Sequence, residues 1–209
     1  MYIQDMFREE RTEALHRFIR TYSLGTLVVG APDLHAQPLP MEIVGDGLGI
    51  IRSHIARRNP ISTTIASGTQ ALAIFHSPDA YISPRWYVNG QRSGRVAPSW
   101  NYMTVHAHGP IRFIDDAPWV MSHLTSLTQI HEAHRTSPWN IMNAPPDFIS
   151  QTARHLVGLE IPVTSLEGKY FLSQQRTAAD RQSIVQNLRM QPHGSAHDVA
   201  ALIERNNPE

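Results

Sequence analysis

The chain of 209 residues contains no cysteine. Without thiols it cannot form disulfides, thiolate metal sites or a cysteine nucleophile. It has no apolar run near the roughly 20 residues that a membrane span requires. Residues 1–5 show no basic segment leading into an apolar run, so we expect no signal peptide. Together these absences predict a cytoplasmic protein with no membrane partner.

A surplus of charge of either sign is also missing. Lysine plus arginine number 18, aspartate plus glutamate number 18, and the formal net charge is zero. General polyanion binders usually show a basic surplus or stripe, so the balance argues against nonspecific nucleic-acid binding. Repeats, low-complexity tracts and Gly/Ser-rich linkers are absent, and the length suits one domain. We expect a single domain over residues 1–209 with a helical C-terminal segment at about 175–206.

Hydrophobic periodicity and turn residues predict the order of the elements. Helices are expected at 9–22, from Pro60 to about Ser67, at 116–135, at 145–155, and after two capping-box patterns, Thr177 with Asp180 and Ser195 with Asp198. Strands are expected at 24–29, 37–44, 48–53, 71–75, 102–114 and, as the last strand, 156–163. Turns are expected at 31–33 and 45–47. This pattern predicts an α+β fold in which about six mostly antiparallel strands could close into a small barrel.

Aromatic and polar side chains are concentrated in one short region. It contains Ala80-Tyr81-Ile82-Ser83-Pro84-Arg85-Trp86-Tyr87, then Ser99-Trp100-Asn101-Tyr102 and Val105-His106. Trp and Tyr offer flat faces with a polar handle, while Ser, Asn and His supply hydrogen-bonding groups. The mixture suits a planar ligand with polar edges. The alternative is that these rings pack in a core or a dimer interface.

A second candidate element is the turn at residues 54–60, which lies between a strand end and an expected helix start. Asn59 suits the N-cap and Pro60 the first helical position. Helix N-termini bind anions, and arginine provides a bidentate fork for phosphate. His54, Arg57 and Asn59 could therefore receive a phosphate monoester. The alternative is an ordinary turn with two solvated arginines.

Other site classes have little support. His106 and His108 share a strand face and His131 and His134 share a helix face, but neither pair comes with the glutamate of a zinc-protease helix motif. We therefore predict no metal site. A nucleophile elbow, a P-loop and a dinucleotide fingerprint are also missing.

The aromatic region resembles the signature of the PaiB-type FMN-binding negative transcriptional regulators. The start Met1-Tyr2-Ile3, the pair Leu39-Pro40, residues 54–60 and Leu172-Ser173-Gln174 fall in the order of that family. The resemblance implies a split β-barrel with FMN bound at the interface of a homodimer. It also implies a transcriptional regulator, with DNA as a further partner.

The resemblance also implies which residues bind the cofactor. On the phosphate side these are Arg57 and Asn59, with His54 in the same turn, while Leu39 and Pro40 would border the isoalloxazine through backbone groups. The residues that would line the site or the dimer seam are Ser83, Trp86, Trp100, Asn101, Tyr102 and His106. The residues that would close over it from one subunit are Lys169, Ser173 and Gln174.

The chain departs from the family pattern in three places. Pro38 stands where the family has a histidine before its Leu-Pro pair. Residues 96–102 hold one residue more than the family's Val-Pro-Thr-Trp-Asn-Tyr, with Ser99 in place of threonine. Residues 90–95 lengthen the same loop. These changes affect the ring side of the expected site more than its phosphate side.

Three functions follow as alternatives. The first is an FMN-binding regulator, although the terminal helices lack a basic recognition face because Arg181, Arg189 and Arg205 are scattered. The second is a flavin-dependent oxidoreductase or flavin reductase, in which His106 or His54 would be the acid–base candidates. The third is a protein that binds another planar cofactor, such as haem or pyridoxal phosphate, with a histidine as the axial ligand of haem.

Overall fold

The computed structural model describes residues 1–30, 33–91 and 94–207 of the chain. The chain divides into two compact units, which are described separately below. Unit 1 comprises Met1–Arg11, His76–Val105 and Glu167–Glu209, and unit 2 comprises Thr12–Phe75 and His106–Leu166. The single domain over 1–209 stays a prediction. The expected turn at 31–33 and the loop insert at 90–95 fall partly outside the described residues.

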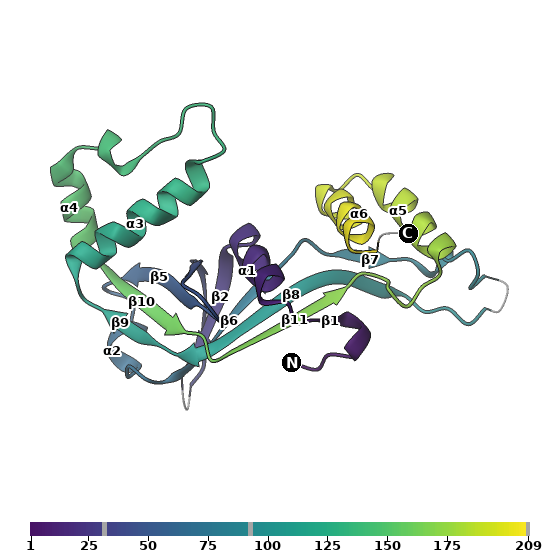
Figure 1. Ribbon diagram of the computed structural model, residues 1–209, viewed down its shortest axis with the longest axis horizontal. Helices are drawn as coiled ribbons and strands as arrows, with labels where there is room; N and C mark the ends of the chain where they lie inside the picture. The colour runs from purple at the N-terminus through teal and green to yellow at the C-terminus, as the bar shows by residue number, and fades with distance from the viewer. Residues whose placement is uncertain (31–32, 92–93, 208–209) are drawn as a thin grey trace. The chain divides into compact units, whose positions relative to one another are not determined.

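Unit 2 contains most of the strands and four of the helices (Figure 1). Its helices are α1 (Thr12–Thr21), α2 (Ile61–Thr64), α3 (Ala117–Glu132) and α4 (Pro146–Arg154), with a short 3-10 helix η3 (Ile141–Asn143). Its strands are β2 (Leu24–Val29), β3 (His35–Pro40), β4 (Glu42–Val44), β5 (Ile50–Ala56), β9 (Arg112–Ile114), β10 (Leu156–Pro162) and most of β6 (Gln70–His76). The second half of β8 (Ser99–Pro110) also belongs to it, from His106 onward.

Antiparallel pairing organises the strands of unit 2. One sheet follows the order β4-β5-β10-β9, and β10 pairs with β5 along its whole length, from Leu156 opposite Ala56 to Pro162 opposite Ile50. The other strands follow the order β8-β6-β2-β3. Side chains alternate along β5, so that Ile51, Ser53 and Ile55 are buried on one face while residues 52 and 54 turn to the other.

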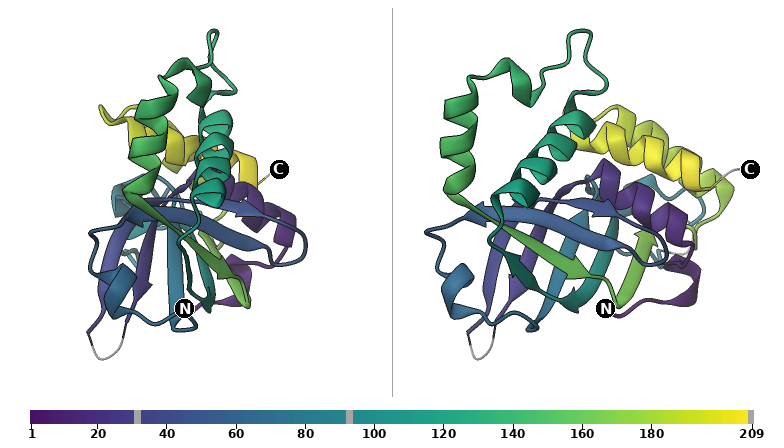
Figure 2. Two further views of the ribbon diagram at one scale, coloured as in Figure 1. Left: turned by 90° about the vertical axis from the view of Figure 1, so that its left-hand side faces the viewer. Right: turned by 60° about the vertical axis from the view of Figure 1, so that its left-hand side comes forward.

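Helices α1 and α3 each pack one face against these strands. The spacing of Ala14, Leu15, Phe18 and Ile19 puts an apolar stripe on α1, and all four side chains are buried. Helices α3 and α4 both lie against β10, and α3 also contacts β5 (Figure 2). Gly158 of β10 permits this approach, because a Cβ there would lie 2.1 Å from the Trp119 ring of α3.

Unit 1 combines short strands with the two C-terminal helices. Its strands are β1 (Arg8–Glu9), β7 (Ala80–Ile82), the first half of β8 and most of β11 (Ser165–Phe171), in the order β1-β11-β8 with β7 also paired to β8. Its helices are α5 (Ala178–Arg189) and α6 (Gly194–Asn206), with 3-10 helices η1 (Asp5–Phe7) and η2 (Pro84–Trp86). In Figure 1, α5 and α6 lie side by side next to β7, and they bury Ile184, Leu188, Val199 and Ile203.

The α+β class and the antiparallel sheets are confirmed, but the number of strands is not. The described residues form eleven strands instead of six, and neither sheet order closes on itself. Strand β11 was missed, because 156–163 was expected to be the last strand. The expected strand 102–114 is instead β8 followed by β9, with residue 111 between them. No helix in the described part of the chain is long and apolar enough to span a bilayer.

The helix starts agree with the sequence in three places and shift in three, since α1 begins at Thr12 instead of residue 9. Thr177 caps α5 by accepting a hydrogen bond from the Asp180 amide, as expected, and α3 and α4 begin close to the predicted residues. Helix α2 ends at Thr64 instead of Ser67, and Pro60, not Asn59, is its N-cap. Helix α6 begins at Gly194 with His193 as N-cap, so Ser195 lies inside the helix.

The contact between Gly158 and Trp119 gives a stability prediction. Gly158→Ala should lower the free energy of unfolding by about 1–3 kcal/mol, because the added methyl group overpacks the seat of α3 on β10. Gly194→Ala is the matched control, since a Cβ there meets nothing within 4 Å, and it should be neutral or slightly stabilising. Urea denaturation of both variants measures the difference. Equal effects would contradict the packing argument.

Candidate functional site

The predicted site residues fall in both units. Leu39, Pro40, His54, Arg57, Asn59 and His106 belong to unit 2, and Ser83, Trp86, Trp100, Asn101, Tyr102, Lys169, Ser173 and Gln174 belong to unit 1. Each group is therefore described within its own unit. Their assignment to a cofactor stays a prediction.

Leu39 and Pro40 close strand β3 in unit 2. They pair with Gly25 and Leu24 of β2, and Leu39 is buried. The carbonyl of Pro40 accepts a 2.7 Å hydrogen bond from the hydroxyl of Ser53, which is fully buried on β5. This bond fixes the backbone at the point where the resemblance expects main-chain contacts to a flavin ring.

The turn after β5 holds Arg57 in a fixed geometry. Its two terminal nitrogens donate to the two carboxylate oxygens of Asp115, each at 2.6 Å. Its Nε donates to the carbonyl of Arg154 at 2.9 Å, and one terminal nitrogen also reaches the carbonyl of Leu156 at 3.2 Å. Hydrogen bonding to Asp115 raises the pKa of Arg57 above its ordinary value, and Arg57 lowers the pKa of Asp115. A phosphate at this guanidinium would compete with Asp115.

Asn59 is held by a second amide from β3. Its Nδ2 donates to Gln37 Oε1 at 2.6 Å, and Gln37 Nε2 donates back to Asn59 Oδ1 at 3.3 Å. The amide nitrogen of Ile61 also donates to Asn59 Oδ1. The neighbouring Arg58 is exposed, and the structure gives it no ion pair among the described residues. Helix α2 has only four residues, so arginine side chains, not a helix terminus, would supply the positive charge of this turn.

His54 takes part in a buried polar network under α3. Its Nδ1 lies 3.2 Å from Nε2 of His123, and Nδ1 of His123 lies 2.7 Å from Oε1 of Glu42. The hydroxyl of Ser126 donates to the other oxygen of Glu42 at 2.7 Å. The ring of Trp119 stacks on His123 with 5.3 Å between centroids. The network links β4, β5 and α3.

Burial and charge set the titration of this network. Burial raises the pKa of Glu42, but the hydrogen bonds from His123 and Ser126 outweigh it and hold the pKa below its ordinary value. An ionised Glu42 can only accept, so Nδ1 of His123 donates to it. Burial, followed by the charge of His123, lowers the pKa of His54 to about 4. His54 is therefore neutral at physiological pH, and its Nε2 is the ring nitrogen left to meet a ligand.

Three predicted residues of unit 1 line one cavity. Ser83, Trp86 and Trp100 border a space of about 590 Å³ together with Tyr81 and residues of α5, α6 and the turn between them. Trp100 is 52% exposed and its ring meets that of Tyr81 edge to face, with centroids 5.9 Å apart. Ser83 caps η2 by accepting a hydrogen bond from the Arg85 amide. Exposed aromatic rings around a cavity suit a planar ligand better than a core.

Asn101 and Ser173 form a buried pair beside this region of unit 1. Their side chains are 0% and 2% exposed, and Asn101 Nδ2 donates to Ser173 Oγ at 2.9 Å. Ser173 has a φ of 63°, the single positive value among the described non-glycine residues. Such strain persists only where surrounding contacts hold it. Gln174 supplies one of them, because its Oε1 accepts from the Leu172 amide at 2.7 Å.

Lys169 and Tyr102 meet on neighbouring strands of unit 1. The ammonium group of Lys169 lies 5.6 Å from the centroid of the Tyr102 ring and 5.8 Å from that of Phe171. This geometry fits a cation–π contact. In unit 2, the half-buried ring of His106 lies beside His108, with centroids 6.4 Å apart.

Sequence reasoning missed the partners that orient the predicted residues. Asp115, Glu42 and His123 are distant in sequence from the residues that they hold, and no local pattern marks them. Tyr87 and Arg176 of unit 1 were also missed as a pair. The Arg176 guanidinium lies 4.0 Å above the Tyr87 ring, and the Tyr87 hydroxyl and Arg176 Nε are buried without a partner among the described residues. A phosphorylated, hydroxyl-bearing cofactor fits this donor set, since it would supply acceptors.

The architecture is that of known flavin- and haem-binding proteins. The FAD and heme binding protein from Mycobacterium smegmatis matches with a TM-score of 0.61 and 16% identity, covering 86% of this chain and 79% of that chain. The flavocytochrome Anf3 from Azotobacter vinelandii matches with a TM-score of 0.58 and 10% identity, covering 81% of this chain and 72% of that chain. At these identities the likeness defines the fold alone.

The sequence defines the family. Residues 1–165 match the family described as "Putative FMN-binding domain", and the chain belongs to this family, with FMN as its cofactor. The protein is also similar to Protease synthase and sporulation protein PAI 2 from Bacillus subtilis, with 29% identity over 98% of this chain and 97% of that protein. The resemblance inferred from the aromatic region is thus confirmed.

The low pKa of His54 predicts a pH dependence of stability. Between about pH 6.5 and 4 the unfolded chain binds a proton at His54 that the folded chain does not bind. The contribution of His54 to the free energy of unfolding is therefore complete above pH 6.5 and is lost as the pH drops through this window. The melting temperature of His54→Gln should fall less between pH 7 and pH 5 than that of the wild type. His155→Gln, at an exposed histidine of the same unit, should keep the wild-type loss, and a wild-type loss in His54→Gln would refute the assignment.

Proposed function

We propose that this protein is an FMN-binding negative transcriptional regulator of the PaiB type that works as a homodimer of split-barrel subunits. Support comes from the family match over residues 1–165 and from the similarity to PAI 2 over nearly the whole chain. The single observation that carries it is this combination of an FMN-binding domain with a relative that covers both units. When bound, FMN supplies redox chemistry, and the residues of this chain bind and orient it.

In this proposal, the candidate contacts to FMN are considered within each unit separately. Arg57 and Asn59 in unit 2 would hold the phosphate, with His54 nearby, while the backbone at Leu39 and Pro40 would border the ring. In unit 1, Ser83, Trp86 and Trp100 line an open cavity with exposed rings, which favours a flat ligand there. The other candidates are Asn101, Tyr102, His106, Lys169, Ser173 and Gln174.

The homodimer is supported by apolar side chains that one chain leaves uncovered. Trp139, just before η3, is 44% exposed, Met142 on η3 is 82% exposed and Phe148 on α4 is 57% exposed. Exposed apolar groups of this size often mark an interface between proteins. The DNA part of the proposal has weaker support, because Arg189 pairs with Glu204 at 2.7 Å and Arg181 donates to the carbonyl of Arg176.

A flavin-dependent oxidoreductase is the second candidate. It is favoured by the fold shared with the flavocytochrome Anf3, whose name indicates a flavin together with haem. In this alternative the protein would reduce an acceptor with electrons from a pyridine nucleotide. The absorbance spectrum of the purified protein tests the haem and pyridoxal phosphate alternatives.

One set of measurements on the purified protein separates these functions. We expect the flavin absorbance doublet, a dimer by light scattering, and DNA retention that weakens as salt increases. Continuous oxidation of NADPH with transfer to an acceptor would instead favour the oxidoreductase, and a Soret band would indicate haem. A colourless monomer that does not bind added FMN would overturn the proposal as a whole.

Because Arg57 pairs with Asp115, substitutions at these two residues should change FMN affinity in opposite directions. Arg57→Ala should weaken FMN binding at least tenfold, because hydrogen bonds between a guanidinium and a charged phosphate are stronger than those between neutral groups. Asp115→Asn should tighten it, because the variant removes a negative charge that competes for the guanidinium. Fluorescence titration of apo-protein measures both affinities. Arg112→Ala, at an exposed arginine of unit 2, is the control, and unchanged affinity in Arg57→Ala would reject the phosphate role.

A further inference from the structure

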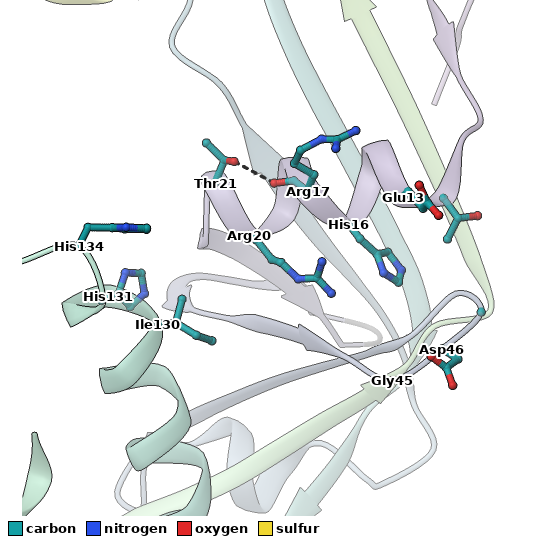
Figure 3. A pocket seen from close by; sticks show the side chains of 12 residues that line it. Glu13, His16, Arg17, Arg20, Thr21, Gly45, Asp46, Ile130, His131 and His134 are labelled. Atoms are coloured by element: carbon teal, nitrogen blue, oxygen red, sulfur yellow. Dashed lines mark hydrogen bonds between the residues drawn. The ribbon is translucent and has the colours of Figure 1, made fainter.

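A large cavity of unit 2 is separate from the residues assigned above. It has a volume of about 1080 Å³ and lies among α1, the turn between β4 and β5, and the C-terminal end of α3 (Figure 3). The residues that line it are Thr12, Glu13, His16, Arg17, Arg20, Thr21, Gly45, Asp46, Gly47, Ile130, His131 and His134. None of them is among the predicted cofactor residues. The cavity is large enough for a small metabolite.

The two carboxylates of the cavity lie toward one end, with Arg17 one helical turn from Glu13, and the other basic groups lie toward the opposite end. Arg20 lies in the last turn of α1, His131 lies in the last turn of α3, and His134 follows two residues after α3 ends (Figure 3). The Oγ of Ser23, which follows α1, lies 3.4 Å from Nε2 of His131 and connects the two helix ends. Glu13 lies in the first turn of α1, two helical turns or roughly 10 Å from Arg20, and Asp46 lies on the same side as Glu13 in Figure 3.

The charged groups of the cavity have no protein partners. In the described part of the chain, the side chains of Arg20, Glu13 and Asp46 take part in no hydrogen bond or ion pair. In Figure 3, Arg20 extends from α1 toward the β4–β5 hairpin, into the space that His16 also borders. His16 is fixed there by a 3.2 Å contact between its Nε2 and the carbonyl of Leu48. An arginine that is aimed into a cavity and forms no ion pair with a carboxylate is available for an anion.

We propose that this cavity binds a sugar phosphate, with the phosphate at the Arg20 end and the sugar hydroxyls at the Glu13 end. Arginine forms bidentate hydrogen bonds with phosphate oxygens, and His131 and His134 can add donors. Carboxylates accept hydrogen bonds from sugar hydroxyls, so Glu13 and Asp46 suit the opposite end. The order of charges thus matches a molecule with one anionic end and one hydroxyl-rich end.

The residues that line the cavity suit a polar ligand better than a bulky aromatic one. Ile130 is the only large apolar residue among the lining residues, and none of them is Phe, Tyr or Trp. Flavin and nucleotide bases are usually held between apolar and aromatic side chains. The cavity of unit 1, with its exposed Trp100 and Tyr81, has that character, while this one has groups for a polar ligand.

Calorimetric titration of the FMN-saturated protein with glucose 6-phosphate tests the proposal. We expect one site per chain, with weaker binding at higher salt because exposed charges are screened. Glucose and inorganic phosphate should each bind at least tenfold more weakly than glucose 6-phosphate, because each meets one end of the cavity. AMP should also bind more weakly, since the cavity offers no surface for its base.

Two variants and a control assign the ends. Arg20→Ala should weaken binding of glucose 6-phosphate at least tenfold. Glu13→Gln should weaken it several-fold while leaving inorganic phosphate unchanged, because only the sugar reaches Glu13. Arg112→Ala, at an exposed arginine of unit 2 outside the cavity, should bind as the wild type does. FMN affinity should be unchanged in every variant, which separates this site from the cofactor site.

Several outcomes would overturn the proposal. They are no binding of glucose 6-phosphate to the FMN-saturated protein, equal binding of inorganic phosphate, tighter binding of AMP, or an affinity that Arg20→Ala leaves unchanged. If Arg20→Ala failed to fold, Arg20→Lys would serve, because it keeps the charge but loses the bidentate geometry. That variant should still weaken binding, and wild-type affinity would reject the role of Arg20.

Discussion

The burial of Glu42 is the constraint on which unit 2 depends. A carboxylate that is 3% exposed needs every partner it has, because an unpaired buried charge costs several kcal/mol. Both partners, His123 and Ser126, come from α3. They lie three residues apart and therefore on one face of the helix. The pairing fixes the rotation and the position of α3 along the strands, which apolar contacts alone define less strictly.

The two candidate sites of unit 2 lie at opposite ends of this helix. Asp115, which holds Arg57, lies two residues before α3 begins at Ala117, and His131, which borders the large cavity, lies in the last turn of the helix. Gly158 allows the helix to approach β10 at Trp119, and Arg52 lies over the same ring at 5.6 Å. A change that releases Glu42 would thus disturb the turn at Arg57 and the cavity together, although neither touches the carboxylate.

The sequence was sufficient where local chemistry decides structure. The apolar stripe of α1, the Thr177 cap of α5 and the proline start of α4 are all encoded within a few residues, and the structure contains each of them. Strand β11 was not recognised because Gly168 and Lys169 interrupt its apolar pattern, and its pairing with β1 comes from the distant N-terminus. Helix α6 begins before the Ser195 capping pattern because His193 already takes the extended conformation of an N-cap.

The candidate site was less accessible to sequence reasoning for a physical reason. Residue types indicated what Arg57 and His54 could bind, but their state depends on partners far along the chain. Asp115 follows Arg57 by 58 residues, and His123 follows His54 by 69. Asp115 holds the Arg57 side chain by two hydrogen bonds, and burial beside His123 keeps His54 neutral. A phosphate at Arg57 must therefore compete with a carboxylate that is already in place. The strength of FMN binding then depends on how much more tightly the guanidinium binds the phosphate than it binds Asp115.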